Sequence, residues 1–274
     1  MRAAFRKILI PVDFSLSTET AVKKAIGIID PDNAHIHLLH VVKRGSSAAI
    51  QLMVRDAERK LAQWKVTIEE TTPGVEARTS ILRGSSVQRM IIESAGLVAP
   101  DLIIIGKKGT RRHRLFHQHI SPDRIAEKSN CPVLTAKPGS IHSRTKIIVI
   151  PIRHFVPERK LDLAILIAQK YRARVHLLAI GGNDNDEKDG LSQTFIKTYD
   201  HLRRKLQRPV EYFSVGRHNP ARAALDYAKF VMADMILVNP ATESGIYGLT
   251  GSRHISDLIA ADSKIQVLDV MPYA

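Results

Sequence analysis

The chain has 274 residues, of which 44% are hydrophobic and 25% are charged. This is typical of one large or two ordinary globular domains with an ample core. The 41 Lys and Arg outweigh the 27 Asp and Glu, so the formal net charge is +14. Such a surplus favours nonspecific attraction to polyanions and carries no information about sequence-specific binding. Aromatic residues amount to only 5%, which argues against a stacking platform for single-stranded nucleic acid.

Nothing in the sequence predicts export or insertion into a membrane. The single cysteine cannot form an internal disulfide, which favours a reducing compartment. The sequence contains no run of about 18 apolar residues that could span a bilayer. Residues 1–7 lead straight into a predicted strand, so no signal peptide is expected. We therefore expect a cytoplasmic protein with no membrane partner.

The first 140 residues alternate between predicted strands and predicted helices. Each strand is a short apolar run or an alternating one, and each helix shows apolar residues at three- and four-residue spacing. The strands are expected at 7–13, 34–42, 75–82, 102–106 and 132–136, and the helices at about 16–29, 50–68, 87–95 and 122–129. Strands that alternate with helices predict a parallel sheet with right-handed crossovers.

A basic loop follows the fourth predicted strand. Gly106 and Gly109 open this loop, and Lys107, Arg111 and Arg112 are among its cationic residues. The loop stands at the carboxyl end of a parallel sheet, where open α/β sheets bind ligands and where helix N-termini favour anions. We therefore expect an anion-binding site here, although a solvated basic loop would show the same pattern.

After a short polar linker the pattern of the first half starts again. Residues 147–153 match residues 7–13 with the proline in register, and residues 233–239 match residues 100–106. Further matched pieces follow in the same order. We therefore predict two tandem α/β domains, at 1–140 and 141–274.

Four stretches of the first half carry a family resemblance. They are Lys7 to Ser15, the strand end Leu39-His-Val41, Asp101 to Gly109, and Arg124 to Val133. Together they resemble the universal stress protein family, and the resemblance extends over both halves. It implies that each domain is a Rossmann-like, five-stranded parallel sheet with strand order 3-2-1-4-5. It also implies that the halves pack through their last strands, and we expect two separate sheets rather than one continuous ten-stranded sheet.

The resemblance also implies a nucleotide site in the first half. Family members that bind ATP have an acidic residue at the end of the first strand, then Gly-x-x-Gly, nine residues, and Gly-Ser or Gly-Thr. Asp13, Gly106 and Gly109 match this pattern, but Ser121 is reached without a preceding glycine. A Cβ at the missing glycine would obstruct the approach of the backbone to phosphates. The candidate ATP-binding residues are Pro11, Asp13, Val41, Gly106, Lys107, Gly109, Arg111, Arg112 and Ser121.

The second half departs further from the ATP-binding pattern. Arg153 stands where Asp13 stands, and Asn239 and Thr242 replace the two glycines. Gly251-Ser252 survives, eight residues after Thr242 instead of nine. We therefore expect that the second half binds no nucleotide and has a structural role.

No catalytic residue and no metal site are predicted. Histidines cluster at 35–40 and 113–119, but no cysteine pair accompanies them, and surface positions explain them better. The protein is expected to be a stress-response regulatory module, with weak ATP hydrolysis left open and a homodimer or a protein partner compatible with the sequence. Two alternatives stay open: an interaction module without nucleotide, and a weak, nonspecific nucleic-acid binder. The second is disfavoured because no DNA-reading motif is present.

Overall fold

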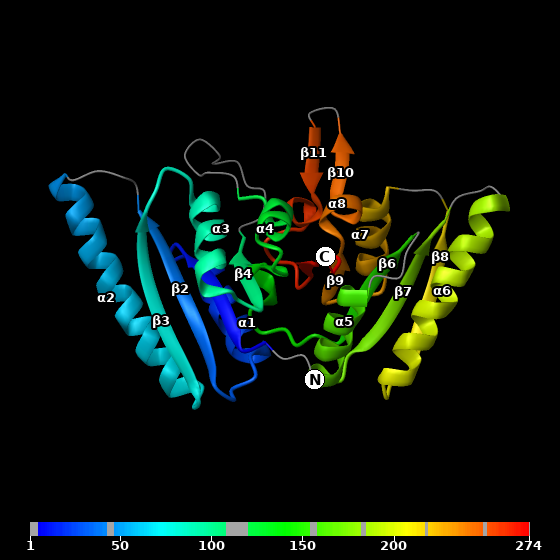
Figure 1. Ribbon diagram of the computed structural model, residues 1–274, viewed down its shortest axis with the longest axis horizontal. Coiled ribbons are helices and arrows are strands. Elements are labelled where there is room, and N and C mark those ends of the chain that lie inside the picture. The colour runs from blue at the N-terminus through cyan, green and yellow to red at the C-terminus, as the bar shows by residue number, and fades with distance from the viewer. Residues whose placement is uncertain are drawn as a thin grey trace.

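The computed structural model describes residues 5–42, 47–107, 120–153, 158–181, 185–216, 219–248 and 251–273. Strands and helices alternate along the chain as expected (Figure 1). The first half contains β1 (Lys7–Val12), α1 (Leu16–Ile28), β2 (Ala34–Val42), α2 (Ala48–Thr71), β3 (Val75–Arg83), α3 (Val87–Val98), β4 (Leu102–Gly106), α4 (Pro122–Ser129), β5 (Val133–Ala136) and the 3-10 helix η1 (Pro138–Ser140).

The second half repeats this alternation with additions near its end. It contains β6 (Ile147–Ile152), α5 (Glu158–Tyr171), β7 (Arg174–Ile180), α6 (Asn185–Lys205), β8 (Val210–Val215), α7 (Pro220–Phe230), β9 (Met235–Val238), α8 (Pro240–Glu243), β10 (Gly245–Gly248), β11 (Gly251–His254), the 3-10 helix η2 (Ile255–Leu258) and β12 (Gln266–Asp269). The two halves lie side by side, with the first half to the left in Figure 1.

Ten strands form one sheet in the order β3-β2-β1-β4-β5-β12-β9-β6-β7-β8. The first five strands keep the expected order 3-2-1-4-5 and pair in parallel, which confirms the predicted fold of this part. On the other side of the junction, β8-β7-β6-β9-β12 follows the same order, again with parallel pairing. In both parts, the first and fourth strands lie next to each other at the centre.

The expectation of two separate sheets is wrong. β5 and β12 are the last strands of the two arrangements, and they pair with each other in an antiparallel ladder, with Val267 opposite Thr135 and Asp269 opposite Val133. An edge strand presents a row of unpaired N–H and C=O groups, and each of these strands satisfies the row of the other. The halves therefore do meet through their last strands, and they do so by main-chain pairing.

In each half, an aspartate side chain accepts hydrogen bonds from the backbone at the start of the first strand. The Oδ2 atom of Asp101, just before β4, accepts two hydrogen bonds from backbone N–H groups at the start of β1, both at 2.9 Å. Asp234, just before β9, does the same for the start of β6 at 2.8 and 3.0 Å. The aspartate that opens each matched motif therefore fixes the register between the two central strands.

Three apolar clusters hold the helices to the sheet. Helices α1, α2, α5 and α6 cover one face, and their cluster contains residues of both halves. On the opposite face, α3 and α4 pack over the first half, while α7 and η2 pack over the second. At the junction, this opposite face carries the buried polar residues Thr135 and Asp269.

A two-stranded antiparallel hairpin, β10–β11, stands apart from the main sheet. It projects at the top centre of Figure 1. Helix α8 and this hairpin make up the segment between β9 and η2. At the matching position, the first half has the basic loop. Sequence analysis did not predict this hairpin, because its two strands are only four residues each.

Candidate functional site

The carboxyl ends of β1 and β4 bring two of the candidate residues to the same edge of the sheet. The two strands are neighbours, paired through Ile8 and Leu102, and Asp13 follows β1 while Gly106 ends β4. A Cβ placed on Gly106 would lie 1.9 Å from the carbonyl oxygen of Ser17, at the start of α1. Gly106 therefore lets β4 end against α1, a packing role that the sequence analysis did not foresee.

Asp13 is hydrogen-bonded to residues at the start of helix α1. Its Oδ1 atom accepts hydrogen bonds from the Ser15 N–H at 3.0 Å and from the hydroxyls of Ser15 and Thr18, both at 2.5 Å. The Asp13 N–H donates to the Thr18 hydroxyl at 3.1 Å. The bonded Ser15 is the N-cap residue of α1, and Thr18 lies in its first turn. The Asp13 carboxylate is thus held in one orientation while the residue stays exposed.

Pro11 and Val41 lie on the two strands next to this edge. Pro11 is in β1 opposite Leu39 of β2, and Val41 is near the end of β2 opposite Leu82 of β3. Both are half-buried. Beside them, the His40 Nδ1 atom makes a hydrogen bond of 2.7 Å with the Val12 carbonyl. These contacts form the side of the crevice that faces β2.

Ser121 precedes helix α4 on the other side of the crevice. Its N–H donates to Gln88 Oε1 at 2.9 Å, and its hydroxyl donates to the Asp123 carboxylate. Gly109, Arg111 and Arg112, together with the histidines at 113–119, lie outside the described residues. The structure therefore places six of the nine candidate residues: Pro11, Asp13, Val41, Gly106, Lys107 and Ser121.

Lys107 is anchored to the second half of the chain. Its Nζ atom forms an ion pair of 2.8 Å with Asp257 Oδ1 in η2, and both side chains are largely buried, with 15% and 8% of their surface exposed. The Nζ atom also lies 3.4 Å from the Ser256 hydroxyl. The sequence analysis predicted that Lys107 binds the phosphates of a nucleotide. In the structure its ammonium is already paired with Asp257, which competes with a phosphate for that charge.

Lys137, just after β5, is a buried lysine whose charge interacts with this ion pair. It is 1% exposed, and among the described residues its Nζ atom has no hydrogen-bond partner. Burial lowers the pKa of this ammonium to about 8, and the charge on Lys107 acts in the same direction, while Asp257 opposes it. A buried cation without a direct partner is unfavourable. No local pattern in the sequence marks Lys137.

A buried hydrogen-bonded chain continues from Lys107 into the junction. The His254 Nδ1 atom lies 2.6 Å from the Ser256 hydroxyl, and its Nε2 atom lies 2.9 Å from Asp269 Oδ1 in β12. Burial raises the pKa of the Asp269 carboxyl, while His254 opposes the shift. Hydrogen-bonded polar groups of this kind help to specify how two packed elements fit together, although Asp269 Oδ2 is buried without a hydrogen-bond partner among the described residues.

The crevice at the matching place in the second half is filled by side chains. Lys160 of α5 and Glu243 of α8 form a buried ion pair of 2.6 Å. The Lys160 ammonium also donates to the Pro151 carbonyl at 2.8 Å, and Glu243 accepts from the Asn239 N–H at 2.8 Å. Burial lowers the pKa of Lys160, and Glu243 opposes that shift. Near this pair, the Arg153 Nε atom is buried without a hydrogen-bond partner in the described part of the chain.

The other second-half residues at the positions of the ATP-binding pattern make contacts within their own segment. Asn239 caps α8, since its side chain accepts a hydrogen bond from the Ala241 N–H at 3.1 Å. Thr242 is exposed within α8. Gly251 and Ser252 begin β11 of the hairpin. These positions therefore build α8 and the hairpin.

The described residues offer little for metal binding, thiol chemistry or membrane insertion. Within the described ranges, no three His, Cys, Asp or Glu side chains come together in a way that could hold a metal ion. The Cys131 thiol is buried, and burial raises its pKa to about 12. Of the helices in the described residues, none is long and apolar enough to cross a membrane.

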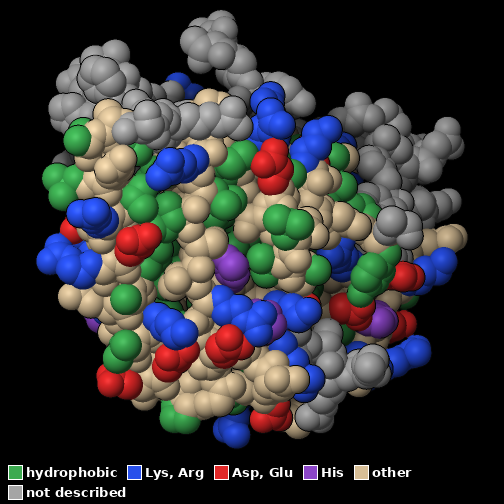
Figure 2. All heavy atoms as spheres, turned by 60° about the vertical axis from the view of Figure 1, so that its left-hand side comes forward, with side chains coloured by type: hydrophobic (Ala, Val, Ile, Leu, Met, Phe, Trp, Pro, Cys, Tyr) green, Lys and Arg blue, Asp and Glu red, His purple; other side chains and the backbone are tan. Residues whose placement is uncertain are grey.

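The basic residues of the face shown in Figure 2 do not form one continuous patch. Lys and Arg side chains there lie among Asp and Glu side chains. Several cations are paired with a neighbour, for example Arg59 and Lys60 with Asp56 and Arg89 with Glu93. On this face the charge is therefore mixed, which does not favour a nucleic-acid-binding surface.

Residues 4–137 match the universal stress protein family. A universal stress protein of Methanocaldococcus jannaschii is 30% identical over 144 residues, which cover 48% of this chain and 82% of that protein. Two solved structures extend over both halves. A universal stress protein from Archaeoglobus fulgidus has a TM-score of 0.69 at 16% identity and covers 97% of this chain and 98% of its own. A putative universal stress protein from Pseudomonas aeruginosa has a TM-score of 0.60 at 17% identity, with coverage of 98% and 94%.

Proposed function

The chain belongs to the universal stress protein family, and we propose that it is a stress-response regulatory module that binds one nucleotide, ATP or a close relative, in its first half. The second half serves as a structural partner. We keep the boundaries 1–140 and 141–274 as part of this proposal. We also place the protein in the cytoplasm, since its one cysteine is a buried thiol.

The observation that carries the proposal is the difference between the two crevices. In the second, the buried Lys160–Glu243 pair occupies the space at the ends of the central strands and is itself satisfied by backbone groups. In the first, the ion pair of Lys107, just after β4, is made with Asp257 of η2, and it leaves Asp13 after β1 exposed. Its edge presents an exposed carboxylate, Asp13, and the backbone of Gly106. A purine with its phosphates is compatible with the first edge and not with the second.

The roles of the candidate residues follow from their places. Asp13, with Pro11 and Val41 on the strands beside it, faces the base, because a fixed carboxylate accepts hydrogen bonds from an amino group. Gly106 and Gly109 supply backbone near the phosphates, and Ser121 stands at the N-terminus of α4, where anions are favoured. Arg111 and Arg112 supply the positive charge. Lys107 contributes less than the arginines, because it is already paired with Asp257.

Calorimetry on the full chain tests these roles. Replacing Asp13 with alanine removes one charge-assisted hydrogen bond, worth about 1.5–3 kcal/mol, so the Kd for ATP should rise by about 10- to 100-fold. The Kd for inorganic triphosphate should stay within about 3-fold, because that ligand has no base. Ser15→Ala is the matched control, since it removes one contact to Asp13 and keeps the carboxylate. Equal losses for ATP and triphosphate would contradict the role of Asp13, and no ATP binding to the native chain would reject the nucleotide function.

A further inference from the structure

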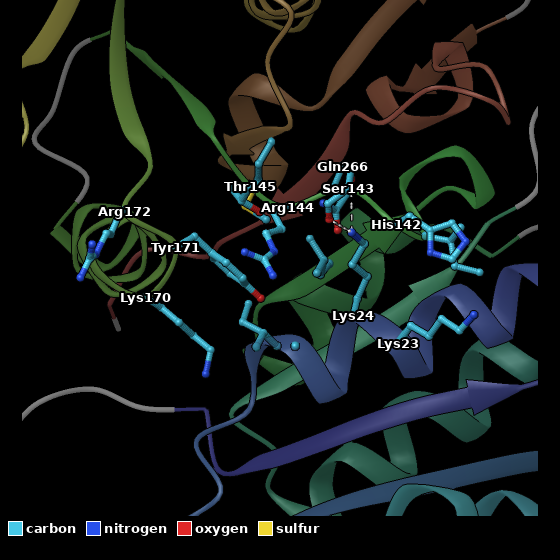
Figure 3. A pocket seen from close by; sticks show the side chains of 15 residues that line it. Lys23, Lys24, His142, Ser143, Arg144, Thr145, Lys170, Tyr171, Arg172 and Gln266 are labelled. Atoms are coloured by element: carbon cyan, nitrogen blue, oxygen red, sulfur yellow. Dashed lines mark hydrogen bonds between the residues drawn. The ribbon is translucent and has the colours of Figure 1, made fainter. Parts of the chain in front are cut away.

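A second pocket lies between the two halves, on the face of the sheet covered by α1 and α5 (Figure 3). Its volume is about 700 Å³, within the range of small-molecule sites. Leu134, Met235 and Gln266 of the sheet form its floor, the ends of α1 and α5 form its walls, and residues 141–145 of the linker close one side. The pocket lies where α1 ends and where β9 and β12 begin, and none of the candidate residues of the first crevice lines it.

The lining of this pocket is strongly cationic. Five Lys and Arg side chains and one histidine line it, and its lining contains no Asp or Glu: Lys23, Lys24, His142, Arg144, Lys170 and Arg172. The Lys23 ammonium forms an ion pair of 3.0 Å with Glu19, which lies outside the pocket lining. Arg144 and Arg172 form no ion pair with any described residue. The lining therefore carries several positive groups and no carboxylate, although the charged ends of Lys23 and Arg172 point away from the middle of the pocket in Figure 3.

Two of the lysines also have a local role. Lys24 Nζ donates to the Ser143 carbonyl at 2.6 Å, and Lys170 Nζ donates to the Ile29 carbonyl at 2.8 Å. Cations are favoured beside carbonyls at the C-terminus of a helix. Lys24 Nζ also donates to the Ser143 hydroxyl at 3.3 Å. Since each ammonium has three donors, at least one donor on each lysine is left for a ligand. Burial lowers the pKa of Lys24 to about 8, and the residue remains mostly charged at neutral pH.

The floor of the pocket offers a hydrogen-bond acceptor beside these donors. The Gln266 side chain is 1% exposed, and its Oε1 atom is buried without a hydrogen-bond partner among the described groups. Figure 3 shows Gln266 next to Lys24 and Ser143, with the Arg144 guanidinium and the Tyr171 hydroxyl directed toward the middle of the pocket. Buried acceptors in proteins are ordinarily satisfied, so this oxygen points to a donor that a ligand would bring.

We propose that this pocket binds a small phosphorylated molecule that carries hydroxyl groups. The Arg144 guanidinium presents a planar pair of donors that suits a phosphate, and Lys24 adds a second positive charge. Gln266 accepts a hydrogen bond from a hydroxyl of the same ligand. A duplex or a long nucleic-acid strand does not fit between two helices and a linker. Because α1, α5 and the linker all contribute to the pocket, the ligand would tie the two halves together.

Binding of ribose 5-phosphate to the full chain tests the proposal, with inorganic pyrophosphate and ribose as companion probes. We expect calorimetry to detect ribose 5-phosphate and pyrophosphate, and not ribose. Arg144→Gln should weaken both phosphorylated probes by at least 10-fold. Arg203→Gln is the control, because Arg203 is an exposed arginine of α6 outside the pocket. Gln266→Leu should weaken ribose 5-phosphate and leave pyrophosphate unchanged. Asp13→Ala should change neither, which separates this site from the nucleotide site.

Three outcomes would overturn the proposal. The first is no binding of either phosphorylated probe at millimolar concentration. The second is an equal effect of Arg144→Gln and Arg203→Gln, because that would reveal attraction to the overall charge of +14. The third is binding of a DNA duplex that depends on Arg144 while ribose 5-phosphate does not bind, since the partner would then be a nucleic acid.

Discussion

Replacement of the buried Lys137 by methionine should stabilise the protein at neutral pH. The lysine is 1% exposed and, among the described residues, its Nζ atom has no hydrogen-bond partner. Its pKa falls from 10.5 to about 8, chiefly through burial. At about 1.4 kcal/mol for each pH unit, this corresponds to about 3 kcal/mol of destabilisation whenever the lysine is charged. Methionine has a similar shape and carries no charge, so Lys137→Met should raise the free energy of unfolding by about 2–3 kcal/mol at pH 7.

The pH dependence of this gain has a definite sign. Below about pH 8 the lysine is protonated in both the folded and the unfolded state, and the full cost of the buried charge is present. Between about pH 8 and 10.5 the unfolded state binds more protons than the folded state, so the wild-type protein becomes more stable relative to the variant as the pH rises. The advantage of the variant should therefore shrink across this window and vanish above it.

Urea unfolding at pH 7 and pH 10.5 measures both effects. Far-UV circular dichroism and the fluorescence of Trp64, the only tryptophan, should give coincident transitions if unfolding is two-state. Lys128→Met is the matched control, because Lys128 is an exposed lysine of α4 and its replacement should have no effect at either pH. A variant no more stable than the wild type at pH 7, or a gain that persists at pH 10.5, would refute the reasoning.

Three further predictions concern packing and chemistry. Gly106→Ala should destabilise the protein by about 1–3 kcal/mol in urea unfolding, because its Cβ would clash with the Ser17 carbonyl, whereas Gly96→Ala, which meets nothing within 4 Å, should not destabilise it. Lys160→Met should cost about 3–5 kcal/mol by leaving Glu243 buried and unpaired, and the double variant with Glu243→Gln should recover most of that loss; no recovery would contradict the pairing. Cys131 should resist a thiol reagent at pH 8 in the native protein and react once urea unfolds it, because burial raises its pKa to about 12; fast native labelling would contradict that burial.

The alternation of strand and helix patterns in the sequence was sufficient to predict a parallel sheet in the first half, whereas the strand order 3-2-1-4-5 came from the family resemblance. Apolar runs bounded by turns and helices mark each parallel strand. Asp101 and Asp234 occupy the same position in the two matched motifs, because each accepts backbone hydrogen bonds from the start of the first strand of its half. The pairing of β5 with β12 could not be predicted in this way. Both strands are only four residues long, and whether their edges pair depends on how the two halves dock.

The contacts of the candidate site were predicted less well than its position. Asp13 and Gly106 do stand at the ends of neighbouring strands, but the family pattern does not reveal their local contacts. Asp13 is hydrogen-bonded to the start of α1, and Gly106 packs closely against Ser17. Lys107 and its partner Asp257 are far apart in the sequence, and no local pattern encodes such a contact. The Lys160–Glu243 pair was missed for the same reason, although Arg153 and Asn239 had indicated that the second crevice differs.

The number of ATP molecules bound by each chain tests the central claim most directly. The claim is that one crevice binds a nucleotide while the buried Lys160–Glu243 pair fills the other. Calorimetric titration of the full chain with ATP should give one site per chain, and Asp13→Ala should weaken that site while Arg153→Ala leaves it intact. Two sites per chain, or one site that survives Asp13→Ala and is lost on Arg153→Ala, would contradict the account.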